Sequence, residues 1–239
     1  MIVVISGKQD HCTQTAVSRW PDSVLLTCTD LSTGGWRYLV SRPLESMAVA
    51  DGNVISVKDI TGVLTRIHCV SGHELTGIVP QDRGYVAGEM TAFLLAWLSS
   101  LTCPVLNEPS TTCLSGPDWT FERWIATAAR LGIPITPVCR STGFGFPSQG
   151  IAHGGSKVNV TVVGRRCLGE VDKTLALQAR RLADAAGVDL LGVEFNVPEA
   201  GACCVGANLW PDLSAPDVAD AVSAFFQEAG PLGGSGVQR

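Results

Sequence analysis

The sequence predicts an α/β fold, in which buried strands alternate with amphipathic helices. The chain opens on the uninterrupted apolar run IVVIS (2–6), which is typical of a buried strand. A short helical segment and a second apolar run follow at the spacing of a β-α-β unit. Hydrophobic residues make up 46% of the chain and charged residues 16%, a balance that allows a sizeable core and excludes an intrinsically disordered protein.

The first half of the chain is expected to form strands and helices at 2–6, 13–20, 23–28, 47–50, 53–56, 62–67, 80–101 and 104–107. Asp51-Gly52-Asn53 separates the segments MAVA and VISV, and this turn sequence predicts a β-hairpin. Pro80 stands where proline is favoured, close to the first position of the long helix.

The second half begins with an amphipathic helix over 118–131, which Gly132 ends. A Gly/Ser/Pro-rich stretch follows, and then a strand, a helix ended by Gly187, two strands and a last helix are expected at 158–163, 174–186, 189–195, 203–207 and 216–228. The predicted regions are an N-terminal α/β domain (1–78), a helical connection (79–137), a loop (138–156), a C-terminal α/β half (157–228) and a flexible tail (229–239).

Charge and composition exclude several classes of protein. The 22 acidic residues outnumber the 17 basic ones, and no Lys/Arg run is present, so a nucleic-acid-binding protein is not expected. Residues 90–107 carry no charge, but their Ser, Thr and Pro content favours a buried helix over a membrane span. The nine cysteines form no C-x-x-C pair and no signal peptide is seen, which predicts a cytoplasmic protein.

One short segment has the composition of a metal site. His68, Cys69, His73 and Glu74 place four potential ligands within seven residues. Two histidines five positions apart in a loop could reach one zinc ion, although the spacing differs from that of helical metalloprotease motifs. The alternative is a loop between a strand and a helix.

The order of motifs from residue 62 onward is more informative than any single motif. An arginine-bearing strand, an acidic helix, a strand ending in Asn-x-Pro and a helix closing on Gly-hydrophobic-Pro follow one another. This order resembles the N-terminal part of ATP-grasp ligases, especially those that act on ribosomally made peptides. The matching positions are Arg66, Asp82, Arg83, Tyr85, Glu89, Asn107, Pro109, Gly132 and Pro134.

The second half continues the resemblance. KVNVTVVGRRCLG (157–169) is similar to the strand that follows the lid of these ligases, and LLGVEF (190–195) is similar to the strand that carries the first magnesium carboxylate, here Glu194. Asn208 matches the asparagine of the family's Leu-Glu-x-Asn-Pro motif, and Gly206 stands in place of its glutamate. The resemblance implies Mg-ATP as cofactor, with Lys157, Arg165, Glu194 and Asn208 at the nucleotide.

Two departures from the family bear on activity. Only the stretch 138–156 stands where an ATP-grasp ligase inserts a lid subdomain with nucleotide-gripping lysines. The family's lysine before the helix 118–131 is also missing, because that position reads Leu114-Ser115-Gly116-Pro117. Phosphoryl transfer needs cationic clamps and bridging magnesium, and the chain has only four lysines in all.

Three functional hypotheses follow. The first is a degenerate, truncated ATP-grasp-like protein that binds a protein or peptide partner as a non-ligating accessory subunit in peptide or natural-product modification. The second is an active minimal carboxylate–amine ligase, or a repurposed enzyme, that uses Glu194 and Asn208 with Arg66. The third is a metal-dependent enzyme at His68 and His73. Trp36 and Trp210 lie in turn-like segments, where exposed tryptophans would indicate a partner surface or a homodimer.

Overall fold

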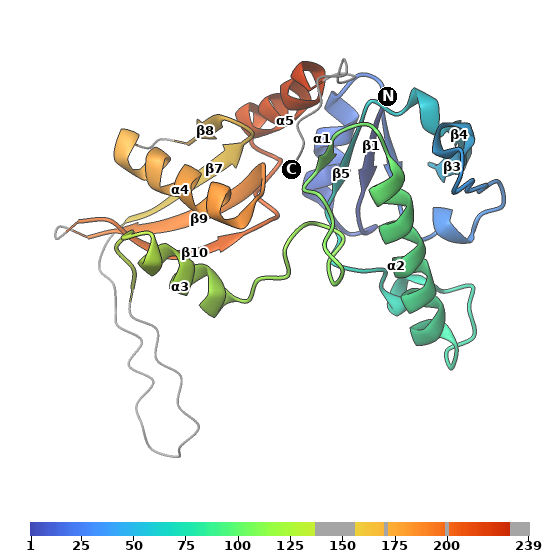
Figure 1. Cartoon of the computed structure of the whole chain (residues 1–239), viewed down its shortest axis with the longest axis horizontal. Coiled ribbons are helices and arrows are strands. Elements are labelled where there is room, and N and C mark those ends of the chain that lie inside the picture. Colours follow the sequence, from blue (N-terminus) through green and yellow to red (C-terminus); the bar gives the residue numbers. More distant parts are fainter. Residues whose placement is uncertain (137–155, 170–171, 199–200, 230–239) are drawn as a thin grey trace. The chain divides into compact units, whose positions relative to one another are not determined.

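The computed structural model describes residues 1–136, 156–169, 172–198 and 201–229 (Figure 1). The predicted loop at 138–156, except for its last residue, and the tail from residue 230 lie outside the described residues. The chain divides into two compact units. Unit 1 comprises Met1–Asp118 and the segment from Asp212 onward, and unit 2 comprises Trp119–Pro211.

Unit 1 contains β1 (Ile2–Ile5), α1 (His11–Arg19), β2 (Ser23–Leu26), β3 (Met47–Ala50), β4 (Asn53–Ser56), β5 (Gly62–Thr65), α2 (Arg83–Ser100), β6 (Val105–Leu106) and α5 (Pro216–Glu228), with short 3-10 helices at Asp30–Ser32, Pro43–Glu45, Val57–Asp59 and Gly72–Glu74. Unit 2 contains α3 (Phe121–Arg130), β7 (Ser156–Val163), β8 (Arg166–Leu168), α4 (Lys173–Ala186), β9 (Leu190–Val197) and β10 (Cys203–Asn208). The predicted elements are confirmed to within a few residues at their ends, and β8 was not predicted.

A parallel sheet with the strand order β2-β1-β5-β6 forms the centre of unit 1. All four residues of β1 are buried, as expected for a strand with a neighbour on each side and a helix over each face. The chain leaves β1 toward β2 and later returns to pair β5 on the other side. Ligands of open α/β sheets bind at the carboxyl ends of the strands beside such a switch point.

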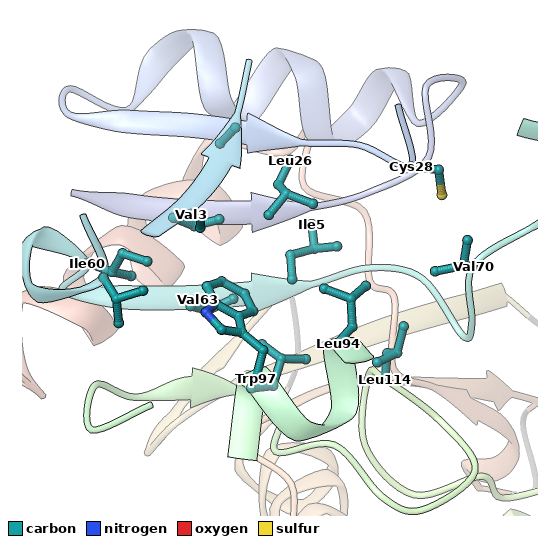
Figure 2. Packing of buried hydrophobic residues seen from close by; sticks show 14 of the residues in the cluster. Val3, Ile5, Leu26, Cys28, Ile60, Val63, Val70, Leu94, Trp97 and Leu114 are labelled. Carbon is teal, nitrogen blue, oxygen red and sulfur yellow. The ribbon is translucent and has the colours of Figure 1, made fainter. Parts of the chain in front are cut away.

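The core of unit 1 lies between this sheet and α2 (Figure 2). Val3, Ile5 and Val63 point from the sheet toward Leu94 and Trp97 of α2, and each of the five is at most 1% exposed. Helix α2 contains residues 90–100 of the uncharged stretch 90–107, and its apolar residues pack in this core. Among the residues that the structure describes, no helix is both long and apolar enough to cross a membrane.

The last helix belongs to unit 1, which differs from the predicted C-terminal half at 157–228. The Trp20 indole Nε1 donates a hydrogen bond of 3.1 Å to the carbonyl of Ala219 in α5. Gly62 leaves the space that the Phe226 ring occupies, since a Cβ there would collide with the ring. The predicted connection at 79–137 is also divided, because α2 packs in unit 1 and α3 in unit 2. These boundaries depend on packing between residues far apart in the sequence.

Unit 2 is an antiparallel sheet, β10-β9-β7-β8, with one apolar face. Val160 and Val162 of β7 and Val193 and Phe195 of β9 point to this face, because alternate residues of a strand share a side. Apolar residues of α3 and α4 complete the cluster. Gly187 ends α4 in the left-handed conformation at φ 67°, as predicted.

Candidate functional site

The opposite face of the unit 2 sheet is lined by polar side chains. Directly paired residues of neighbouring strands project to the same side, and Glu194 pairs with Asn159 of β7 and Gly206 of β10. The register extends this face by two residues in each direction. Its polar side chains are those of Lys157, Asn159, Thr161, Glu194, Asn196, Cys203 and Asn208, and we call this set the polar face.

An ion pair crosses the polar face. Lys157 Nζ lies 2.6 Å from Glu194 Oε1, and the side chains are 77% and 37% exposed. The carboxylate is therefore already paired with an internal ammonium group. Because both groups reach solvent, the pair contributes only about 0–1 kcal/mol to stability, and it can rearrange when a ligand binds.

Phe121 lies against Gly206, the residue directly opposite Glu194. A Cβ built on Gly206 would lie 3.6 Å from Phe121 Cε2, which is ordinary van der Waals contact. A glutamate side chain extends well beyond Cβ, so the ring stands in the path of any longer side chain at this position. The polar face thus has an apolar ring where the resemblance implies a second carboxylate.

Asn208 folds back over the neighbouring strand. Its Oδ1 accepts a 2.9 Å hydrogen bond from the Trp210 backbone N–H, and its amide lies beside Gly192, where a Cβ would come within 3.4 Å of Nδ2. Gly192 therefore allows the Asn208 side chain to lie close to β9. The register places Asn208 two residues along β10 from Gly206, the partner of Glu194, and therefore on the same face, as the resemblance implies.

Asn196 is the buried polar residue of this face. It is 4% exposed, and its Nδ2 has no hydrogen-bond partner among the described residues. Cys203 of β10 is the cross-strand partner of Asn196, and the Cys203 thiol lies 3.3 Å from Thr136 Oγ1. A buried amide donor without a partner is costly, so it is a candidate ligand contact.

The residues present do not fit the magnesium site that the resemblance implies. Magnesium is usually held by one or two carboxylates together with phosphate oxygens. On strands β7, β9 and β10 of the described structure, Glu194 is the one carboxylate of the polar face, and it is paired with Lys157. No group of three or more His, Cys, Asp or Glu side chains that could hold a metal ion occurs among the described residues.

Arg165 lies outside the polar face. It is exposed in the turn that joins the end of β7 to β8, whereas Lys157 lies near the start of β7. At about 3.3 Å per residue, the two positions are separated by roughly 25 Å along the strand. The structure therefore does not bring Arg165 together with the other expected nucleotide contacts.

Arg66 is placed at the carboxyl edge of the unit 1 sheet, where β5 ends. Its side chain is 7% exposed, and Nε donates a 2.9 Å hydrogen bond to Asp10 Oδ2. Asp10 also caps α1, because its carboxylate accepts hydrogen bonds from the Thr13 backbone N–H and hydroxyl. Burial alone would raise the pKa of Asp10, but the bonds from Thr13 and Arg66 lower it overall.

A second carboxylate lies close to this cluster. Hydrogen bonds from Ser214 lower the pKa of Asp212, with smaller effects from Cys12 and Arg66. The Cys12 thiol donates to Asp212, and this bond, followed by burial, raises the thiol's pKa. The thiol is therefore protonated at neutral pH. Arg66 is thus paired with Asp10, and its positive charge also acts on Asp212.

The candidate metal segment does not converge. His68 Nδ1 lies 3.9 Å from Asp118 Oδ1. Glu74 turns toward Gly7, where a Cβ would lie 2.9 Å from its Oε1, while His73 is exposed in the 3-10 helix. Among the residues that the structure describes, His68, Cys69, His73 and Glu74 form no group of three metal-binding donors.

Trp36 and Trp210, the two tryptophans expected in turn-like segments, differ in their surroundings. Trp36 packs edge-on against Phe93 and Trp97 at centroid distances of 5.1 and 5.5 Å, and its indole donates to the Asp30 carbonyl. It is therefore partly buried against the unit 1 core. Trp210 is 43% exposed.

Sequence reasoning missed Asn196 and Phe121. Asn196 could have been found, because polar and apolar residues alternate through Val193-Glu194-Phe195-Asn196 and place it beside Glu194. The same alternation in Lys157-Val158-Asn159 marks β7. Phe121 gives no such signal, since its position over Gly206 depends on how α3 packs against β10.

Comparison with known proteins shows which solved structures share this fold. No protein family profile and no curated protein sequence matches the chain. Among solved structures, the macrocyclase MdnC of Microcystis aeruginosa, bound with its precursor peptide MdnA, aligns at a TM-score of 0.70 and 12% identity over 96% of this chain and 100% of MdnC.

Two further solved structures, both of ATP-grasp ligases, have a similar fold. The ATP-grasp ligase PsnB, complexed with a phosphomimetic variant of its minimal precursor, Mg and ADP, aligns at 0.65 and 14% identity over 94% of this chain and 98% of its own. A RiPP-associated ATP-grasp ligase of Chryseobacterium gregarium, complexed with ADP and a leader and core peptide, aligns at 0.61 and 12% over 96% and 97%. At these identities the likeness concerns the fold alone. The chain has a mixed α/β fold that matches the structures of ATP-grasp ligases.

Proposed function

We propose that this chain is a degenerate ATP-grasp-like protein that binds a peptide partner without ligating it, as an accessory subunit in peptide or natural-product modification. The observation that carries the proposal is the state of Glu194. Its carboxylate is paired with Lys157 at 2.6 Å, and the residue opposite it is Gly206 beneath Phe121. An ATP-grasp site needs carboxylates free to hold bridging magnesium, because phosphoryl transfer relies on positioning and charge neutralisation.

The missing cationic clamps support the same proposal. Leu114 and Ser115 stand where the resemblance implies a nucleotide-gripping lysine, and both are at most 1% exposed. The stretch 138–156 is short for a lid subdomain, and this support comes from the sequence alone. A truncated scaffold of this kind retains binding surfaces more readily than catalysis, because catalysis needs all of its charged groups at once.

A peptide is the proposed partner because the neighbours in fold were solved with precursor peptides. A cytoplasmic setting would suit the eight described cysteines, which are all free thiols. The exposed Trp210 is a candidate contact for the peptide, since exposed tryptophan is enriched at interfaces.

The test is an assay for ADP formation by the purified chain, with Mg-ATP and a synthetic peptide that carries both glutamate carboxylates and a lysine amine. We expect no ADP above a blank without protein. ADP formation that depends on the peptide would overturn the proposal and favour an active minimal ligase using Glu194 and Asn208.

A gain-of-function variant tests the observation on which the proposal depends. Gly206→Glu combined with Phe121→Ala supplies a second carboxylate opposite Glu194 and removes the ring above it. We expect this variant to bind Mn²⁺, as a spectroscopic substitute for magnesium, at least tenfold more tightly than the wild type. Gly206→Ala with Phe121→Ala is the matched control. Equal Mn²⁺ affinity in both variants would show that the lost glutamate is not what disables the site.

A further inference from the structure

The hairpin of β3 and β4 leaves one strand edge of unit 1 open (Figure 1). In an antiparallel pair, residues that exchange hydrogen bonds alternate with residues whose main-chain groups point away from the partner strand. The Ser46 carbonyl accepts a bond from the Val57 N–H, so the bonded pairs are Ser46 with Val57, Ala48 with Ile55, and Ala50 with Asn53. Val54 and Ser56 lie between these positions, and their N–H groups and the Val54 carbonyl therefore point away from β3.

The corresponding edge of β3 is already paired. Met47 exchanges two main-chain hydrogen bonds with Arg37, of 3.0 and 2.8 Å. The structure gives β4 no such neighbour, because among the described residues the N–H and carbonyl of Val54 and the N–H of Ser56 have no hydrogen-bond partner. Three main-chain groups are thus available along the outer edge of β4.

The β4 edge also lacks the features that usually prevent an edge strand from pairing with another chain. Natural edge strands are protected by lysine, proline or a β-bulge. The segment Asn53-Val54-Ile55-Ser56 contains no charge and no proline, and its register with β3 is regular. The Val54 side chain is 51% exposed. An open, uncharged edge with an exposed β-branched residue favours the addition of another strand.

A pocket of about 170 Å³ begins at the residue that follows β4. It is lined mainly by apolar side chains, among them Leu44, Val57, Ile60, Leu101 and Pro104. Thr61 also lines the pocket, and because Thr61 and Pro104 directly precede β5 and β6, the pocket lies at the amino edge of the unit 1 sheet. Arg66 and Asp10 lie at the other, carboxyl edge. A pocket of this size and lining suits one apolar side chain.

We propose that an extended segment of a peptide partner adds to β4 as a third strand of the hairpin and places one apolar side chain in this pocket. The proposal rests on the proposed function in taking the partner to be a peptide, and it adds the surface and the conformation in which the peptide binds. Hydrogen bonds to the main chain of Val54 and Ser56 supply affinity, and the pocket selects an apolar residue.

A second copy of the chain fits this edge less well than a peptide does. A strand of four residues is about 13 Å long, so pairing of two β4 edges buries far less than the roughly 1,000 Å² that a stable dimer needs. A peptide needs only a short edge and one anchoring pocket, and both are present here.

Two pairs of variants separate the open edge from the rest of the hairpin. Val54→Pro removes an N–H that points away from β3, so the bonds within the hairpin remain while the outer edge is blocked. Val54→Thr keeps this N–H and the β-branched shape, and it is the matched control. Leu44→Ser removes an apolar side chain from the pocket. Its control is Val40→Ser, because Val40 is 77% exposed and does not line the pocket.

The experiment selects peptides from a random decapeptide library displayed on phage, with the full chain as bait and no nucleotide present. We expect the selected peptides to share an apolar residue. Their affinity, measured by calorimetry, should fall about tenfold in Val54→Pro and about threefold in Leu44→Ser, and it should be unchanged in the two controls. By NMR, a bound peptide should slow hydrogen exchange at the amides of Val54 and Ser56, whereas the Ile55 amide is protected in both states by its bond to Ala48.

Three results would overturn the proposal: no selected peptide, selected peptides that bind Val54→Pro as tightly as the wild type, or a wild-type dimer that Val54→Pro dissociates in sedimentation. Circular dichroism checks that each variant is folded. If Val54→Pro does not fold, hydrogen exchange in the wild type decides, and unchanged exchange at Val54 and Ser56 on peptide binding contradicts the proposal.

The outcome is separable from that of the proposed function, because peptide docking is measured without ATP. Peptide-dependent ADP formation would refute the accessory role and leave docking at β4 intact. Loss of docking at β4, with no ADP formed, would refute only the surface proposed for the peptide.

Discussion

The two units hold their ion pairs in different surroundings. In unit 1 Arg66 is 7% exposed, pairs with an Asp10 carboxylate that also caps α1, and lies near a second carboxylate, Asp212. In unit 2 Lys157 is 77% exposed and pairs with Glu194 across an open sheet face. The first pair is enclosed by bonds that fix loops to one another, whereas the second keeps donors available. The comparison predicts that loss of the buried pair costs more unfolding free energy than loss of the exposed pair.

The largest effect is expected from Arg66→Met. This substitution leaves Asp10 partly buried without its cation, and breaking a buried pair in this way costs about 3 kcal/mol of unfolding free energy. Urea unfolding measures the loss. Arg42→Met is the control, because Arg42 pairs with Glu45 on the surface and should change stability by less than about 0.5 kcal/mol. Equal losses in the two variants would contradict the structural role of Arg66.

A glycine in each unit extends the comparison. Gly62→Ala forces a methyl group into the Phe226 ring, and overpacking of this kind costs about 1–3 kcal/mol. Gly206→Ala meets Phe121 only at ordinary contact distance, 3.6 Å, so it should change stability much less. Thermal unfolding of the two variants measures the difference. A larger loss of stability in Gly206→Ala than in Gly62→Ala would contradict the close contact between Gly62 of β5 and Phe226 of α5.

Low pH should lower the unfolding free energy of unit 1, because the Asp10 carboxylate becomes protonated. Its pKa is lowered in the folded protein from an ordinary value of 3.8, so the folded state binds fewer protons than the unfolded state. The stabilisation is complete above that ordinary pKa and is lost as the pH falls through the lowered folded-state value. We expect Asp10→Asn to flatten the dependence of unfolding free energy on pH below about 4. An unchanged acid limb in this variant would show that Asp10 is not the responsible carboxylate.

The smallest effect is expected from Lys157→Met. Because the Lys157–Glu194 pair is exposed, its loss should change unfolding free energy by less than about 0.5 kcal/mol. Urea unfolding measures the change. A stability loss as large as that of Arg66→Met would remove the distinction between the two pairs.

Much of the fold could be predicted because its signals are local. The apolar run of β1, the Asp51-Gly52 turn and the glycine that ends α4 each depend on a few adjacent residues. The candidate site was predicted in part for the same reason. Glu194 and Asn208 follow recognisable segments, and the structure places both on one face of the unit 2 sheet.

The segment from His68 to Glu74 shows the limit of local reasoning. His68 and His73 are close in the sequence, but in the structure His68 lies 3.9 Å from Asp118 and His73 stands in the 3-10 helix at Gly72–Glu74. Closeness along a chain does not fix the direction of side chains in a loop. Arg165 lies away from Lys157 for a related reason, because a strand of eight residues carries its two ends far apart.

The sequence by itself determined the order of strands and helices, the α/β class and the resemblance to ATP-grasp ligases. Tertiary structure alone decided that α5 packs in unit 1, that Lys157 pairs with Glu194, and that Phe121 covers Gly206. The physical reason is the range of the interactions. Periodicity and turns are set by neighbours within a few residues, whereas cross-strand register and helix packing join residues whose separation along the chain carries no signal of their contact.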